Sequence, residues 1–229
     1  MELNAIYKES GLISYNKVTE WIKQFSHTNI LETLEHATPA KRKVIAQTPG
    51  VNSYTLLELN NVSIKPSTFF TRLQMLDLGS MPRNNWVDFS NLFMLLTGQP
   101  IHFFDADKVA GDIIIRNATE GEQFTDLFSM VHTLTPTDIV IADNQKVLAL
   151  AGVVGGLESG VTENTTNILV EIANFDAVIV RKTGTRLSLR TDSELRYEKN
   201  INPWGTLYML LFFLEELNYF AKDLGSFEK

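Results

Sequence analysis

The sequence predicts an α+β fold, with strands and helices in separate groups along the chain. Of the 229 residues, 44% are hydrophobic and 21% are charged, which is typical of a globular chain that can bury a core. Short runs rich in β-forming residues gather in the middle of the sequence, whereas the clearest helical patterns stand before and after them. Because helices and strands do not alternate strictly, the pattern favours α+β over a doubly wound parallel sheet.

Residues 1–50 are predicted to form a helical appendage and linker, and residues 51–229 the main domain. Val18–Phe25 has apolar residues at helical spacing, and a second short helix is expected at Ile30–Leu34. Pro39–Pro49 contains two prolines and the basic run KRK, a composition typical of a linker.

The main domain is expected to open with a strand over Tyr54–Val62. A helix follows, for which Ser67 is the predicted N-cap and Gly79 the stop signal. Four large apolar side chains share one face of this helix: Phe69, Phe70, Leu73 and Leu76. A second helix is expected over Trp86–Leu96. The remaining elements are strands at 113–115, 139–142, 147–151 and 168–172 and helices at 176–187 and 203–222.

Composition excludes several classes of function. The chain has no cysteine, so disulfides, thiolate catalysis and cysteine-ligated zinc are ruled out. Its longest apolar run, Leu207–Leu214, is far shorter than the roughly 20 residues that span a bilayer. With no secretory signal pattern at the N-terminus either, a cytoplasmic protein without a membrane partner is expected.

The charge balance argues against a general nucleic-acid binder. The formal net charge is −7, whereas a DNA- or RNA-binding face is normally basic. One segment runs the other way, with six positive charges among three acidic ones: Arg181, Lys182, Arg186, Arg190, Arg196 and Lys199. The simplest interpretation is a solvated helix face, and any tRNA binding should be weak and depend on this segment.

Three stretches carry a family likeness. They are NNWVDFSNLFMLLTGQPIHFFDADK over 84–108, ALAGVVGGLESGVTENTTNILVE over 149–171 and FDAVIVRKTGTRLSLRTDSELRYEKNINP over 175–203. In order and spacing they resemble the editing region of bacterial-type phenylalanyl-tRNA synthetase beta chains, and the likeness runs from about Tyr54 to about Leu217. It implies a three-layered α+β fold in which a β-sandwich of unusual topology is covered by helices.

The resemblance also implies a function in protein biosynthesis. Editing regions of this family hydrolyse tyrosyl-tRNA formed by mistake on phenylalanine tRNA, because a pocket that hydrogen-bonds a hydroxyl rejects the analogue without one. The implied partners are phenylalanine tRNA and the synthetase alpha chain. The region needs no cofactor; ATP and Mg belong to the complete synthetase, and no ligase activity is expected from this chain alone.

Site residues carry over by position in the three stretches. The resemblance implies hydrolytic roles for Ser90, Asn91 and His102, and substrate contacts for Gly155, Glu171, Thr191 and Ser193. No metal site is implied, since His102 and Asp105 lack a third ligand. Ser90 is interpreted as a hydrogen-bonding residue rather than a nucleophile, because no Gly-x-Ser-x-Gly turn surrounds it.

Residue chemistry alone leaves these roles open. Glu171 ends an apolar strand, so its carboxylate either points into a cavity or pairs with a nearby base such as Arg186. His102 stands among aromatic residues, where a histidine is more often part of the core than functional. Asn91 and Asp88 lie about one turn apart, and either one is able to brace a loop. The glycines at 152, 155 and 156 suit a close backbone approach.

The sequence also departs from the family pattern. Arginine is common in the family at Met81, threonine at Ser90 and alanine at Phe103. These differences favour one alternative, a degenerate, non-catalytic structural module of the same synthetase. A free-standing deacylase that acts in trans is a further alternative.

Overall fold

A computed structural model of the chain describes residues 2–7, 11–13, 38–39 and 42–219. The helices expected at Val18–Phe25 and Ile30–Leu34 lie outside these ranges.

The first strands are β1 (Glu2–Tyr7), β2 (Gly11–Ile13), β3 (Thr38–Pro39), β4 (Val44–Ala46) and β5 (Val51–Leu59). Then come α3 (Phe69–Asp77), α4 (Asn85–Thr97), β6 (Ile101–Asp105), the short 3-10 helix η1 (Ala106–Lys108), β7 (Ile113–Asn117), β8 (Gln123–Thr125) and β9 (Val131–Thr133). The chain continues with β10 (Ile139–Ala142), β11 (Val147–Leu150), β12 (Val154–Gly155), β13 (Ile168–Phe175), α5 (Ala177–Leu187), α6 (Asp192–Tyr197) and α7 (Gly205–Tyr219).

The larger sheet has the strand order β2-β1-β5-β13-β6, with β3 added in parallel beside β1. Strand β13, next to the edge strand β6, pairs antiparallel with β5 and with β6. All eight residues of β13 are buried, because both faces of this sheet are covered. The pleat therefore sorts side chains into two cores by the parity of their position.

Side chains at even-numbered positions of β5 and odd-numbered positions of β13 enter the core between the two sheets. Tyr54, Leu56 and Leu169 of the larger sheet meet side chains of the second sheet such as Ile115 and Leu148. That second sheet has the order β12-β11-β10-β7-β4, with β4 parallel to β7.

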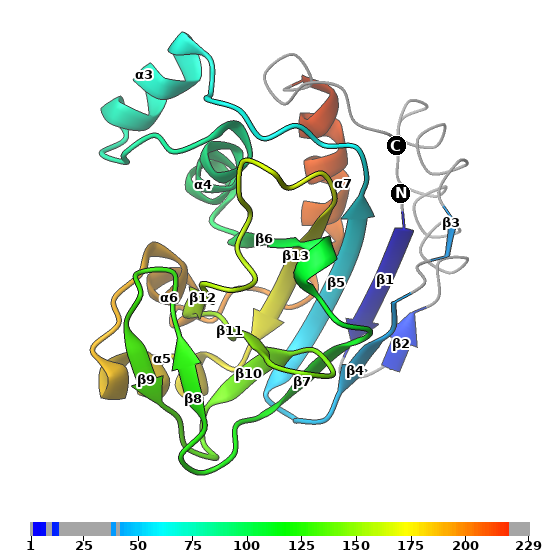
Figure 1. Ribbon diagram of the computed structural model, residues 1–229, viewed down its shortest axis with the longest axis vertical. Helices are drawn as coiled ribbons and strands as arrows, with labels where there is room; N and C mark the ends of the chain where they lie inside the picture. Colours follow the sequence, from blue (N-terminus) through cyan, green and yellow to red (C-terminus); the bar gives the residue numbers. More distant parts are fainter. Residues whose placement is uncertain (1, 8–10, 14–37, 40–41, 220–229) are drawn as a thin grey trace.

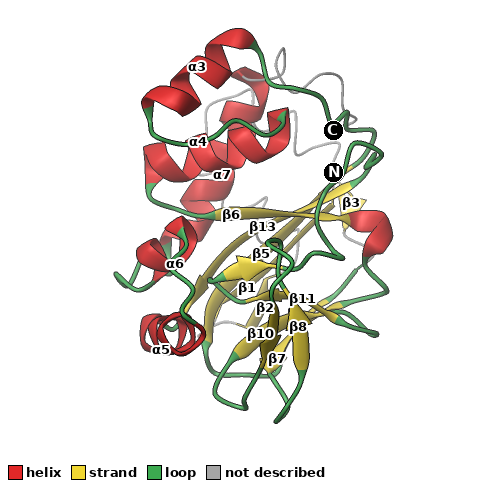
Figure 2. Cartoon of the chain, turned by 60° about the vertical axis from the view of Figure 1, so that its left-hand side comes forward, coloured by secondary structure: helices red, strands yellow, loops and turns green. Residues whose placement is uncertain are grey.

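Side chains at the alternate positions of the same strands enter a second core, between the larger sheet and the helices. Leu57, Val170 and Phe103 pack against α4 and α7, mainly against Trp86 and Phe213. Figure 2 shows these helices on one side of the larger sheet and the second sheet on the other. The result is three layers with two packed sheets, which confirms the expected fold class.

Helix ends follow their capping chemistry. Asn84 caps α4 by accepting from the Val87 N–H, and Gly98 ends it in the left-handed conformation, with φ 78°. The cap of α3 is Thr68 rather than the predicted Ser67, whose hydroxyl instead donates to Asp88 at 2.6 Å.

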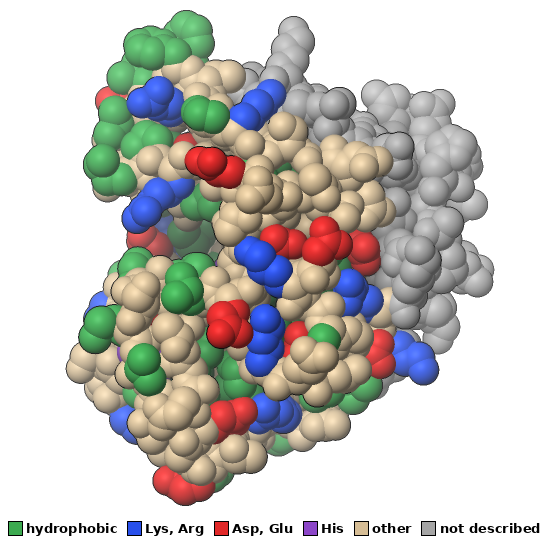
Figure 3. All heavy atoms as spheres, in the orientation of Figure 1, with side chains coloured by type: hydrophobic (Ala, Val, Ile, Leu, Met, Phe, Trp, Pro, Cys, Tyr) green, Lys and Arg blue, Asp and Glu red, His purple; other side chains and the backbone are tan. Residues whose placement is uncertain are grey.

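The four apolar side chains of α3 are exposed rather than buried. Phe69 and Phe70 are 73% and 76% exposed, and Thr71 and Met75 are the residues of α3 that are buried. Figure 1 places this helix away from the body of the molecule, and Figure 3 shows apolar side chains gathered over it. Helical periodicity thus predicted the helix but not the face that packs.

Several other expectations need correction. The stretch predicted as a linker contains β4, which extends the second sheet beside β7. The first strand of the main domain begins at Val51, three residues before the predicted start. Sequence patterns did not predict β6, the hairpin of β8 and β9, or α6. The division of the chain at residue 50 stays a prediction. No helix in the described ranges is long and apolar enough to cross a membrane.

Replacing Phe213 by alanine should strongly destabilise the fold. This ring is fully buried on α7, with its centroid 5.6 Å from Phe89 and 5.9 Å from Phe93. Truncating a buried phenylalanine costs about 3–5 kcal/mol in the free energy of unfolding. Urea denaturation measures the change. Phe70→Ala, at an exposed helix position, is the matched control and should stay within about 0.5 kcal/mol; equal effects of the two changes would contradict the described packing.

Candidate functional site

A cavity of about 360 Å³ opens between α4, the edge strand β6, the β11–β12 turn and the start of α6. Figure 3 shows the surface hollowed between the helical layer and the β8–β9 hairpin. All seven site residues expected from the sequence line this one cavity: Ser90, Asn91, His102, Gly155, Glu171, Thr191 and Ser193. Their chemical roles remain predictions.

Glu171 and His102 form the polar centre of the cavity. They stand directly opposite each other on the antiparallel strands β13 and β6. Cross-strand partners project to the same face of a sheet, so both side chains are directed to the cavity side. The two residues lie 69 positions apart in the sequence, and only the β13–β6 register brings them together.

The Glu171 carboxyl is held by a tyrosine and not by a basic residue. The Tyr54 hydroxyl donates to Glu171 Oε2 at 2.9 Å. Arg186, one of the bases considered for Glu171, contacts Asp138 instead. Arg181 and Lys182 are exposed on α5. Within the described ranges Glu171 forms no salt bridge, and its side chain lines the cavity.

Burial shifts both titrating groups toward their neutral forms. Burial raises the pKa of Glu171 to about 8, while the hydrogen bond from Tyr54 acts in the opposite direction. Burial lowers the pKa of His102 to about 4. Near pH 7 the cavity therefore holds a largely protonated carboxyl and a neutral imidazole.

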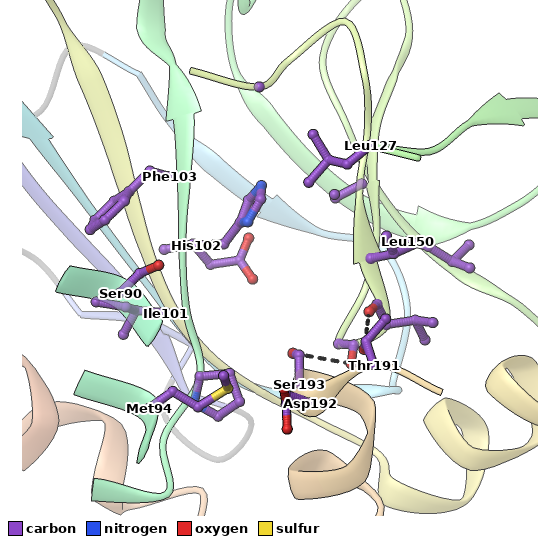
Figure 4. Close-up of a pocket in the computed structure, with 18 of the residues that line it drawn as sticks. Ser90, Met94, Ile101, His102, Phe103, Leu127, Leu150, Thr191, Asp192 and Ser193 are labelled. Carbon is purple, nitrogen blue, oxygen red and sulfur yellow. Dashed lines mark hydrogen bonds between the residues drawn. The ribbon is translucent and has the colours of Figure 1, made fainter. Parts of the chain in front are cut away.

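The His102 ring occupies space that is open because residue 155 is a glycine. A Cβ on Gly155 would lie 2.5 Å from His102 Cε1 and 2.8 Å from Nε2, closer than real side chains approach. The His102 ring meets the Phe104 ring edge to face, with centroids 4.6 Å apart. Among the described residues, no group forms a hydrogen bond with the buried Nε2 of His102. Figure 4 shows His102 projecting into the cavity, with Leu127 facing it and Phe103 turned the other way.

The hydroxyls of Thr191 and Ser193 hold the glycine turn in place. Thr191 Oγ1 donates to the Val153 carbonyl at 2.6 Å, and Ser193 Oγ donates to the Gly152 carbonyl at 3.4 Å (Figure 4). Gly152 itself has φ +71°, a conformation that favours glycine. Because both hydroxyl protons are used in this way, these oxygens can act toward a ligand only as acceptors.

Ser90 and Asn91 are the polar residues of α4 that line the cavity, and Asp88 braces the start of the helix. The Ser90 hydroxyl donates to the Val87 carbonyl at 2.8 Å, so it is a hydrogen-bonded helix residue. Asn91 also lines the cavity. Asp88 is the bracing residue, since it accepts from the Arg83 N–H at 2.8 Å and from Ser67.

Sequence reasoning missed part of the wall. Leu127 and Phe128, in the turn between β8 and β9, line the cavity, as do Met94 and Tyr197. The hairpin turn is held by Asp126, which accepts from the Phe128 N–H and meets His132 Nε2 at 2.7 Å. No local signal in the sequence links this hairpin to the cavity, because the contact is made by residues far apart in the chain, such as the Leu127 N–H that donates to the Gly155 carbonyl at 3.0 Å.

His102 and Asp105, the two residues considered as metal ligands, do not face a common site. No group of three or more histidine or carboxylate side chains suited to a metal occurs within the described ranges. Asp105 accepts from Thr165 at 2.6 Å and lies 3.2 Å from Lys108 Nζ. Three positions from His102 on a strand, it projects to the opposite face of the sheet.

Comparisons with known proteins agree on one family. The profile described as the B3/4 domain matches residues 50–221. The chain is 40% identical over 178 residues to the phenylalanine--tRNA ligase beta subunit of Solibacter usitatus. The aligned region covers 77% of this chain and 23% of that protein. The chain is 41% identical over 184 residues to the beta subunit of Staphylococcus haemolyticus, with 80% and 23% covered.

The chain spans about a fifth of the length of these curated relatives. A solved structure, the N-terminal fragment of the phenylalanyl-tRNA synthetase beta subunit from Pyrococcus horikoshii, is 15% identical with a TM-score of 0.44. That match covers 65% of this chain and 49% of the other.

Glu171→Gln should change how stability depends on pH. The folded pKa of Glu171, about 8, lies above its ordinary value of 4.5, so the folded state binds the extra proton and stability falls as pH rises between those values. His102, with a folded pKa of about 4 against 6.5, adds the opposite slope only below pH 6.5. From pH 6.5 to 8 the wild type should therefore lose stability, by up to about 1.4 kcal/mol per pH unit.

The glutamine variant should lose that decline. Denaturant unfolding at pH 6.5, 7.25 and 8 gives the three free energies needed. Glu158→Gln, at an exposed carboxylate, is the matched control and should keep the wild-type slope. A wild-type curve that is flat over this range would mean that Glu171 ionises normally in the folded protein.

Proposed function

The chain belongs to the B3/4 domain family, and on this premise we propose that it is an editing module that hydrolyses tyrosyl-tRNA mischarged on phenylalanine tRNA. The observation that supports this most is the pairing of Glu171 and His102 across one strand pair, in a cavity whose remaining wall is largely apolar. A cavity of about 360 Å³ is in the range that holds a small ligand such as an aromatic side chain.

Each polar group suits a part of such a substrate. An aromatic ring matches the apolar wall made by Met94, Leu127 and Val153. The carboxyl of Glu171 offers a hydrogen bond to a phenolic hydroxyl. A phenylalanine side chain in the same place would leave that carboxyl without a ligand partner, and an unpaired buried polar group is costly.

The hydrolytic step needs placement of a water more than a strong base. An aminoacyl ester is activated, so a water held in line with the carbonyl carbon supplies much of the rate. The neutral imidazole of His102 has a buried Nε2 without a hydrogen-bond partner among the described residues, and we assign to this nitrogen one hydrogen bond to that water or to the substrate, formed when the cavity wall adjusts to the ligand. Because its pKa is about 4, we assign it an orienting role and not that of a strong general base.

The departures from the family pattern leave the polar centre of the cavity, Glu171 and His102, unchanged. Met81 is 72% exposed and is not among the residues that line the cavity. Phe103 lines the cavity, but its ring packs in the helix–sheet core, with its centroid 5.6 Å from that of Trp86. Ser90 keeps a hydroxyl, as threonine would. The editing proposal therefore stands above the non-catalytic alternative.

The proposed partners follow the same reasoning. We propose phenylalanine tRNA as the substrate carrier and the synthetase alpha chain as a partner in a cytoplasmic complex. Most of the basic segment at 181–199 is already paired: Arg186 with Asp138, Arg190 with Glu194 and Glu198, Arg196 with Asp192, and Lys199 with Glu198. This supports weak tRNA binding by the isolated chain.

Glu171→Ala should remove discrimination between tyrosine and phenylalanine. The measurement is the rate of deacylation of phenylalanine tRNA charged with either amino acid. Leaving the buried phenolic hydroxyl without its partner costs about 1–3 kcal/mol, so the ratio of kcat/KM for tyrosyl over phenylalanyl ester should fall roughly five- to hundredfold. Glu158→Ala serves as the surface control. A wild-type protein that hydrolyses neither ester, or both equally, would count against editing by this chain.

Gly155→Ala should disable hydrolysis by moving His102. The added Cβ would sit 2.5 Å from the imidazole, which must then turn away. A misplacement of about 1 Å costs on the order of a hundredfold in rate, so tyrosyl-tRNA deacylation should fall by that factor. Gly205→Ala is the matched control, because its Cβ would come no nearer than 3.9 Å to Asn202. Unchanged hydrolysis in Gly155→Ala would show that the position of His102 does not matter.

A further inference from the structure

Tyr54 contacts the polar centre of the cavity from behind. Its hydroxyl lies 2.9 Å from Glu171 Oε2, and the two side chains are 0% and 5% exposed. Tyr54 pairs with Ala173 across β5 and β13, while Glu171 pairs with Leu56. Tyr54 and Glu171 are therefore diagonal neighbours on one face of the sheet, close enough for a long side chain to reach across.

The tyrosine ring has little freedom to move. It lies in the core between the two sheets, in edge-on contact with Phe175 at a centroid distance of 6.5 Å. Side chains in a close-packed core lie in rotamer minima and interdigitate with their neighbours. The position of the phenolic oxygen, and with it the position of Glu171 Oε2, is set by the packing of the inter-sheet core.

The two carboxyl oxygens of Glu171 are thus unequal. Oε2 accepts from Tyr54, whereas no side chain or backbone group among the described residues donates to Oε1. Glu171 itself lines the cavity. We propose that Tyr54 is a positioning residue that fixes the Glu171 carboxyl and leaves Oε1 as the single oxygen offered to a ligand, so that a phenolic hydroxyl is selected over a bare ring. This deepens the editing proposal and rests on it.

The hydrogen bond also decides where the Glu171 proton sits. A hydroxyl that donates to Oε2 makes that oxygen the acceptor, so in the protonated carboxyl the proton is carried by Oε1. Toward the cavity, Oε1 then donates when protonated and accepts when ionised. A phenol is both donor and acceptor and fits both states, whereas a phenyl ring fits neither.

Other titrating groups around Glu171 are few. From β6 it faces His102, from β5 Tyr54, and from α6 Tyr197 and Asp192, which line the same cavity. Tyr197 is the natural comparison, since it is an equally buried tyrosine beside the cavity. Its hydroxyl donates to the Ala173 carbonyl at 3.0 Å rather than to Glu171.

The ligand-free protein provides the first test. The titration of the Glu171 carboxyl carbon is followed by NMR in wild type, Tyr54→Phe and Tyr197→Phe. Loss of a donor that favours the ionised carboxylate should raise the Glu171 pKa further above about 8 in Tyr54→Phe. Tyr197→Phe should produce a much smaller shift. Equal shifts in the two variants, or none in Tyr54→Phe, would overturn the proposed positioning.

Selectivity provides the second test. In Tyr54→Phe, the kcat/KM ratio for tyrosyl over phenylalanyl ester on phenylalanine tRNA should fall roughly tenfold, mainly through KM for the tyrosyl ester. An unchanged ratio, despite a shifted Glu171 titration, would overturn the role in selection. If the wild type deacylates neither ester, the editing proposal fails, while the titration still decides whether Tyr54 controls the carboxyl.

If Tyr54→Phe does not fold, the NMR resonance of the Tyr54 hydroxyl proton in the wild-type protein provides the test. If the hydroxyl is bonded to Glu171, its proton resonance should move with the same midpoint as the Glu171 carboxyl carbon. A Tyr54 hydroxyl proton that is insensitive to the titration of Glu171 would refute the contact, and with it the positioning role.

Discussion

The two-sided pairing of β13 is the constraint on which the rest of the structure depends. With β5 on one side and β6 on the other, all eight of its residues are buried, and alternate side chains enter different cores. Ile168, Val170 and Ile172 hold the helices, whereas Glu171 reaches the cavity from the other face. A slip of one residue would exchange the two sets, placing the carboxyl among the phenylalanines of α4 and α7. The hydrophobic pattern of β13 therefore fixes the position of its one charged residue.

That position carries a cost in stability. Burial shifts Glu171 and His102 toward their neutral forms, which means that the folded state disfavours the charges that these residues carry in water. A purely structural sheet would place valine or leucine at both positions. The surrounding packing is strong enough to hold them: the helix–sheet core contains Trp86, Phe89 and Phe213, all nearly or fully buried. Polar groups retained against such a cost are more readily explained by a ligand than by folding.

Local patterns predicted the longer helices and several of the strands. The strand at 139–142 has the predicted bounds, and the helix expected at 176–187 begins one residue later, after its cap Asp176. Strand β6 escaped prediction because both of its faces are covered, so IHFFD shows no alternation of apolar and polar residues. The exposed face of α3 shows the opposite failure: periodicity reports an apolar stripe but not whether anything packs on it.

The site was less accessible to local reasoning. Ser90, Asn91, His102, Gly155, Glu171, Thr191 and Ser193 were chosen by family resemblance, and the structure brings them around one cavity. Tyr54 was not among the residues chosen. Its contact with Glu171 joins residues 117 positions apart through the β5–β13 register, and no local pattern indicates such a contact. Leu127 and Phe128 depend likewise on where a hairpin folds back. Contacts set by strand register are not visible in sequence windows of ten or twenty residues.

A cavity whose titrating groups are neutral selects ligands differently from a charged one. A charged carboxylate would attract any cation and would weaken in salt, whereas a mostly neutral carboxyl in an apolar wall distinguishes ligands by hydrogen bonding and shape. Under the proposed function, that is the distinction required, since tyrosine and phenylalanine have equal charge and differ by one hydroxyl. Because a phenol can either donate to or accept from Oε1, recognition would persist while Glu171 titrates around pH 8. The fixed orientation of the carboxyl, and not its charge, is then the property that the inter-sheet core has to preserve.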